Sequence, residues 1–98
     1  MFSGFVRIPR DGVYSFYTAS DNGSRLYIGD ALVVDNDGPH SMRERSGAVA
    51  LKAGLHAVRV AFFQHVGDHG LEVRYQGPDL SKQLIPAEAL YRVSTTGA

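Results

Sequence analysis

Two short clusters of acidic, amide and glycine residues are the part of this 98-residue chain with the clearest chemical potential. They are Asp21-Asn22-Gly23 and Asp35-Asn36-Asp37-Gly38. Calcium takes about six to eight oxygen ligands, and carboxylates balance most of its charge. The clusters could therefore begin a calcium shell if they met at one end of the fold. The residues assigned to that shell are Asp21, Asn22, Asp35 and Asp37.

The same clusters have plainer interpretations. Asp, Asn and Gly are the ordinary residues of turns, because they tolerate unusual backbone angles and bond to their own backbone. Carboxylates and amides can also bind the hydroxyl groups of a sugar. The pattern leaves a calcium site, a sugar site and a pair of hairpin turns as open alternatives.

A second group of polar residues, His65-Val66-Gly67-Asp68-His69, lies in a later loop. A His-x3-His pair binds zinc where both rings share one face of a helix, but Gly67 and the flanking strand patterns argue against a helix here. We interpret the segment as a solvated connection or as a loop that contacts sugar. The residues assigned to the rim of such a sugar site are His40, His65, Asp68 and His69.

Tyr17 and Tyr27 are the aromatic side chains that could stack on a sugar ring. Both are out of phase with the apolar residues Phe16, Leu26 and Ile28, so we expect both to face outward. Outward tyrosines are also common on strands that bind nothing. Of the two tyrosines only Tyr27 is assigned to the carbohydrate site, which also takes in Asp21 and Asn22 beside the rim residues.

No arrangement of side chains predicts an enzyme. Ser20 and Asp21 adjoin, but no histidine is placed to act as a base with an orienting acid. His56 is in phase with Val58 and Val60, so we expect it to face inward and to bond to a carbonyl group. Spacing alone does not decide whether two carboxylates could cleave a glycoside.

The composition argues against several classes of partner. Ten basic and ten acidic side chains cancel, so there is no basic field to attract nucleic acid or anionic lipid. No apolar stretch is long enough to span a membrane. The absence of cysteine excludes disulfides and thiolate metal sites. The length suits one domain with its own core.

The elements that must position these residues follow a period of two, which is typical of strands. Residues 25–28 and 31–34 predict a hairpin that turns at Gly29-Asp30. Residues 35–47 are predicted to form the longest loop, and residues 55–64 the longest strand. About seven or eight short strands predict an antiparallel β-sandwich. We expect one domain over residues 1–93 and a frayed tail over 94–98.

A series of motifs, in order along nearly the whole chain, resembles the PA14 domain family. They are FSGFVRIP at residues 2–9, GVYSFY at 12–17, SDNGSRLYI at 20–28, VDNDG at 34–38, LKAGLH at 51–56, GLEV at 70–73, GP at 77–78 and IPAEAL at 85–90. Within the family the chain is most similar to PA14-type modules of secreted bacterial glycoside hydrolases such as β-hexosaminidases.

The resemblance implies a β-sandwich that is not itself an enzyme and whose ligand is usually a glycan. In lectin-like members a calcium ion bridges sugar hydroxyls and an Asp-Asp pair joined by a cis peptide bond, at the position of Asp21-Asn22. Here Asn22 removes one carboxylate. The family also usually carries a first strand ahead of Phe2, and a sandwich without it would have an open sheet edge.

We therefore expect a non-catalytic carbohydrate-binding accessory module of a glycan-active or adhesive protein, with calcium as a candidate cofactor. The parent would be an exported bacterial protein, extracellular or periplasmic. The alternative is a structural interaction module that packs on a catalytic domain or a partner strand and binds no sugar. Expected partners are a glycan, a neighbouring domain, or a second copy at the open sheet edge; nucleic acid binding and membrane insertion are not expected.

Overall fold

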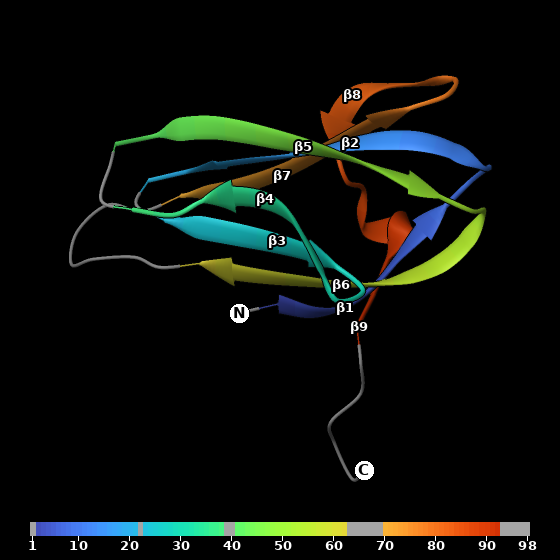
Figure 1. The fold of residues 1–98 in the computed structure, drawn as a ribbon, viewed down its shortest axis with the longest axis horizontal. Coiled ribbons are helices and arrows are strands. Elements are labelled where there is room, and N and C mark those ends of the chain that lie inside the picture. Colours follow the sequence, from blue (N-terminus) through green and yellow to red (C-terminus); the bar gives the residue numbers. More distant parts are fainter. Residues whose placement is uncertain (1, 22, 39–40, 63–69, 93–98) are drawn as a thin grey trace, which may run out of the picture.

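The computed structural model describes residues 2–21, 23–38, 41–62 and 70–92 and shows two antiparallel sheets that face each other (Figure 1). The first sheet has five strands in the order β4 (Ala31–Asn36), β3 (Ser24–Ile28), β6 (Gly54–Phe62), β1 (Phe2–Ile8) and β9 (Leu90–Arg92). The second has four, in the order β5 (Arg43–Leu51), β2 (Gly12–Ser20), β7 (Leu71–Gly77) and β8 (Leu80–Leu84). A short 3₁₀ helix, η1 (Ala87–Ala89), precedes β9. The predicted antiparallel β-sandwich is confirmed.

The core lies between the two sheets and is built from alternate residues of each strand. Its buried members are Val6, Ile8, Tyr14, Phe16, Leu26, Ile28, Val34, Val58, Val60 and Tyr75. Phe16 and Tyr75 pack with ring centroids 6.3 Å apart. The Tyr14 hydroxyl donates a hydrogen bond of 2.7 Å to the Arg10 carbonyl, so its polar tip is satisfied although the ring is fully buried. The period-two pattern therefore identified the core face correctly.

The prediction of a long loop over residues 35–47 is wrong. The strand β4 continues to Asn36, and β5 already begins at Arg43. All nine residues of β5 pair with β2, from Leu51 opposite Gly12 to Arg43 opposite Ser20. This backbone pairing overrides the polar composition of the segment, because strand formation depends strongly on what lies alongside. The strand β8 was missed for the same reason: it is polar, and it pairs with β7.

The two sides of the sandwich are closed differently. On one side β4 crosses close to β5, and a Cβ atom on Gly47 would collide with the Val33 carbonyl. On the other side, the expected open edge beside β1 is covered in part by β9, which pairs with Gly4, Phe5 and Val6. Within the described chain, no strand pairs with Phe2 on that side. No helix of the described residues has the length and apolarity needed to cross a bilayer.

Candidate functional site

The two acidic clusters meet at one end of the sandwich, because the β3–β4 hairpin returns the chain to where β2 ended (Figure 1). Residues 20, 21 and 23–25, residues 35–38 and Gly70 lie together here, and we call this region the loop end. A Cβ atom on Gly23 would lie 2.6 Å from Oδ1 of Asp37. The Asp21 amide donates a 3.2 Å hydrogen bond to the Gly70 carbonyl. Glycine at position 23 thus lets the two clusters touch.

Arg25, on β3, binds both acids of the second cluster. Its Nη2 lies 2.6 Å from Oδ2 of Asp37, and its Nε lies 3.4 Å from Oδ1 of Asp35. The hydrogen bond to Asp35, followed by the charge of Asp37, raises the pKa of the Arg25 guanidinium. The chain therefore supplies its own cation to this pair of carboxylates.

Backbone amides bind oxygens of the second cluster as well. The Asp37 amide donates to Oδ1 of Asp35 at 3.2 Å, and the Gly38 amide donates to Oδ1 of Asp37 at 2.8 Å. A calcium ion does not fit these carboxylates as arranged, since it would have to displace Arg25. Among the described residues, no group of three or more His, Cys, Asp or Glu side chains could hold a metal ion. Calcium coordination by Asp21, Asp35 and Asp37 stays a prediction.

Asn36 sits between the two acids in sequence but faces the core. Its side chain is fully buried. Its Nδ2 donates to the carbonyls of Thr18 at 3.1 Å and Arg43 at 2.7 Å, and its Oδ1 accepts from Nε of Arg43 at 3.0 Å. Beside it, the Ser20 and Ser24 hydroxyls are 2.8 Å apart. This buried polar network joins β4 to β2 and β5 and so shapes the loop end from beneath.

The sequence contained a signal for that network. Asn36 is two residues after Val34, and both are fully buried. Continuing the period of two through the cluster would have turned Asn36 inward and left Asp35 and Asp37 outward. Because the cluster has the composition of a turn, we did not extend the alternation of inward and outward residues through it.

The two expected aromatic platforms lie on opposite outer faces of the sandwich. Tyr27 is on the five-stranded sheet, and the guanidinium carbon of Arg59 lies 4.3 Å from its ring centroid. Tyr17 is on the four-stranded sheet, with Nζ of Lys82 at 4.3 Å from its ring centroid. Each ring therefore already carries a cation, and Tyr27 stays a predicted sugar contact.

The other assigned residues are Asn22, His40, His65, Asp68 and His69, all of which lie outside the described residues. The cis bond expected between Asp21 and Asn22 lies outside them as well. His56 is described, and its Nε2 is 2.7 Å from the Lys52 carbonyl. The expected carbonyl contact of this histidine is confirmed, but the ring is half-buried rather than part of the core.

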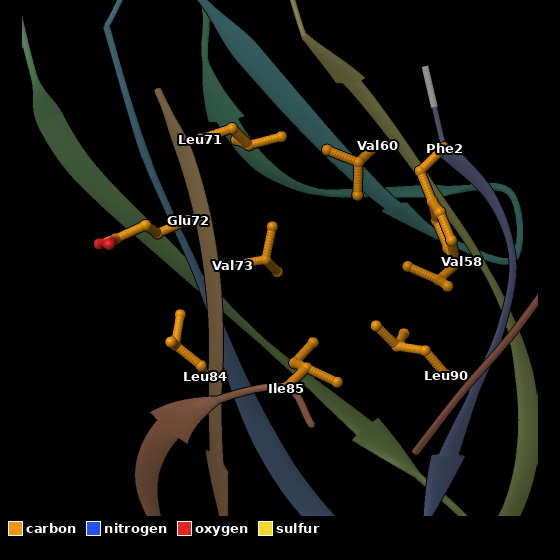
Figure 2. A pocket seen from close by; sticks show the side chains of 9 residues that line it. All are labelled: Phe2, Val58, Val60, Leu71, Glu72, Val73, Leu84, Ile85 and Leu90. Carbon is orange, nitrogen blue, oxygen red and sulfur yellow. The ribbon is translucent and has the colours of Figure 1, made fainter. Parts of the chain in front are cut away.

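A pocket of about 400 Å³ opens between the two sheets. It is lined by Phe2, Val58, Val60, Leu71, Glu72, Val73, Leu84, Ile85 and Leu90 (Figure 2). Figure 2 shows the Glu72 carboxylate pointing away from the pocket, and this group binds Nη1 of Arg74 at 2.8 Å. The pocket offers apolar walls without inward polar side chains, so it does not suit a sugar. A polar ligand is better matched by the loop end.

Comparisons with known proteins match a domain family and several anti-sigma factor proteins. The family model described as "PA14 domain" matches residues 1–89. The Anti-sigma-I factor RsgI3 of Acetivibrio thermocellus is 30% identical over 91 residues, which is 92% of this chain and 14% of that protein. The solved structure of an anti-sigma factor domain-containing protein is 28% identical with a TM-score of 0.89, and it covers 94% of this chain and 32% of its own.

A second solved structure, an anti-sigma factor domain-containing protein from Clostridium clariflavum, is 27% identical with a TM-score of 0.83. It covers 93% of this chain and 32% of its own. The chain thus spans well under half the length of each of these three relatives.

These names overturn one sequence-based expectation. The relatives are anti-sigma factor proteins, so the assignment to an accessory carbohydrate-binding module of a glycan-active or adhesive protein is wrong, and so is the likeness to glycoside hydrolase modules. The motifs behind that assignment are fold-forming residues of the sandwich and its turns. Such residues recur wherever the fold is used and do not identify the parent protein.

Proposed function

The chain belongs to the PA14 domain family, and from this premise we propose that it is the ligand-sensing domain of a larger regulator of the anti-sigma factor type. Its ligand is a glycan, bound at the loop end. The names of the relatives support the regulatory setting. The small share of each relative that the chain spans supports the assignment of a single module, with the other functions carried elsewhere in the protein.

The observation that carries the ligand proposal is the mixture of donors and acceptors at the loop end. The side chains of Arg25, Asp35 and Asp37 are 35%, 53% and 42% exposed, and they lie in direct contact. A sugar hydroxyl both donates and accepts hydrogen bonds, so it needs acceptors such as carboxylates beside a donor such as a guanidinium. The buried network around Asn36 holds these groups on a rigid support, which reduces the cost of binding.

The regulatory setting also supports a non-catalytic role, since the relatives are named as regulators rather than as enzymes. We propose that the domain works on the outer side of the cell membrane, because polymeric glycans are found there. A sensor of this kind must bind its ligand reversibly. Contacts from a few exposed polar side chains are suited to weak, reversible binding.

The test is a titration followed by NMR of backbone amides. The probes are N-acetylhexosamines, hexoses and pentoses, as monosaccharides and as soluble oligosaccharides, each with and without calcium. We expect at least one sugar class to shift amides of residues 20–25 and 35–38. Asp37→Asn should weaken that binding by about tenfold, the scale of a lost charge-assisted hydrogen bond.

Asp30→Asn is the matched control, because Asp30 is an exposed aspartate at the opposite end of the same hairpin. This variant should bind as the parent chain does. Two results would overturn the proposal: no loop-end shift with any of these sugars, or an equal loss of binding in both variants.

A further inference from the structure

The outer face of the five-stranded sheet combines exposed apolar side chains with arginines. Phe5, Leu32, Leu55 and Tyr91 are exposed by 37%, 46%, 55% and 39%. Strand pairing brings these side chains together: Phe5 is opposite Tyr91, and Leu55 is opposite Arg7. Tyr27 lies between Leu32 on one side and Arg59 on the other. We call this surface, with Arg25, the arginine face.

The arginine face carries positive charge that the acids among the described residues do not balance. The strands of this sheet contain a single carboxylate, Asp35, and Arg25 already binds it. Within the described residues, no carboxylate lies within ion-pair distance of Arg7 or Arg59. The chain as a whole has a formal net charge of zero, so this excess is local.

The opposite face of the sandwich differs. On the four-stranded sheet, Lys82 binds Glu44 at 2.9 Å and Arg74 binds Glu72 at 2.8 Å. These two cations are paired with acids of the same chain, whereas Arg45 on β5 is exposed and has no ion pair among the described residues. The arginine face differs in that two neighbouring strands, β1 and β6, each present an arginine, Arg7 and Arg59, without an acid partner among the described residues.

We propose that the arginine face docks a protein segment in which carboxylates alternate with apolar side chains. Charge complementarity favours an acidic partner, and exposed apolar patches on soluble domains commonly mark protein contacts. Arginine and tyrosine are also enriched at protein interfaces. The exposed leucines favour a protein over a sugar polymer, since leucine gives neither a flat ring to stack on nor a hydrogen bond.

The size of the face indicates the strength of the contact. Five strands spaced by about 4.8 Å, each roughly 20 Å long, give a surface on the order of 400 Å². A standard interface buries about 800 Å² on each partner. The contact should therefore be transient, with a dissociation constant in the micromolar range or weaker. The inference goes beyond the proposed glycan site and does not rest on it.

The test uses the chain labelled for NMR and three short soluble peptides. The first contains glutamate, leucine and phenylalanine; the second replaces glutamate with lysine; the third replaces leucine and phenylalanine with serine. Only the first should saturably shift amides of β1, β3, β6 and β9. The double variant Arg7→Gln, Arg59→Gln should bind it about fivefold more weakly, while Lys82→Gln on the opposite face should bind it unchanged.

Several results would overturn the proposal. They are equal binding of the lysine peptide, shifts confined to the loop end or to the four-stranded sheet, and equal affinity of the double variant. Concentration-dependent shifts on this face without peptide would identify a second copy as the occupant instead. The substituted arginines are exposed, and an unchanged amide spectrum outside the face would show that each variant is folded.

Discussion

Replacing Asn36 with alanine tests whether the buried polar network supports the loop end. The substitution removes the donors to the Thr18 and Arg43 carbonyls and the acceptor for Nε of Arg43. A buried polar group left without its partner costs roughly 1–3 kcal/mol, and two carbonyls lose their donor. We therefore expect the free energy of unfolding to fall by about 3 kcal/mol. For a domain near this size, that corresponds to a melting temperature lower by about 15 °C.

Urea and thermal unfolding, followed by circular dichroism, measure the change. The denaturation midpoint should fall while the slope with urea stays constant, which indicates lost stability rather than a changed unfolded state. The control is Asp30→Asn, at the exposed turn of the same hairpin, which should leave the midpoint nearly unchanged. A loss below about 1 kcal/mol for Asn36→Ala would refute the reasoning, since it would mean that water or rearrangement replaces the network at little cost.

Three further predictions follow from the same structure. Gly47→Ala should cost about 2 kcal/mol or more in thermal unfolding, because its Cβ would meet the Val33 carbonyl where the sheets close; an unchanged midpoint would contradict that close approach. Arg25→Gln should lower the melting temperature, and calcium should restore it more than it affects the parent chain, since two carboxylates lose their cation; equal calcium responses would contradict this. Burial raises the pKa of Tyr75, so its stabilising effect is complete below pH about 10 and is lost as the pH rises through the folded-state value. Tyr75→Phe should therefore reduce the alkaline loss of stability, and the exposed Tyr91→Phe should not.

The sequence predicted the fold well where one face of a strand is buried. Leu26 and Ile28 on β3, and Val58 and Val60 on β6, alternate with outward residues, and all four are buried. The prediction of strands failed where a strand forms mainly through backbone hydrogen bonds to its neighbour rather than through burial of one face. In β5 no residue is fully buried; residues 48–51 were predicted as a strand, but the polar first half, residues 43–47, was predicted as loop, and its pairing with β2 decided the structure. Edge strands have only one neighbour to satisfy, and their sequences are correspondingly less constrained.

The acidic clusters show that composition alone does not determine what a polar cluster binds. Their composition made turns the default interpretation and left a metal site and a sugar site open, because Asp, Asn and Gly serve in turns and their polar side chains also bind ions and hydroxyls. These three interpretations can be told apart only when it is known which other side chains lie next to the carboxylates in the fold. Arg25 precedes the hairpin turn and belongs to neither acidic cluster, yet it binds two carboxylates of the second. Pairing of β3 with β4 places it opposite Asp35, and that register depends on the bulge between Leu26 and Tyr27, which the sequence did not reveal.

Three consecutive residues at the loop end have different roles because of their phase along β4. Asp35 faces outward and binds Arg25; Asn36 faces inward and closes the buried network; Asp37 follows the strand and contacts Gly23. A ligand at the loop end would touch the two aspartates, while Asn36 would hold them in place without touching it. Substitution of Asn36 should therefore weaken ligand binding only as far as it loosens the fold, whereas Asp37→Asn should weaken binding in a domain that stays folded. Measuring affinity and unfolding together in both variants separates a positioning residue from a contact residue.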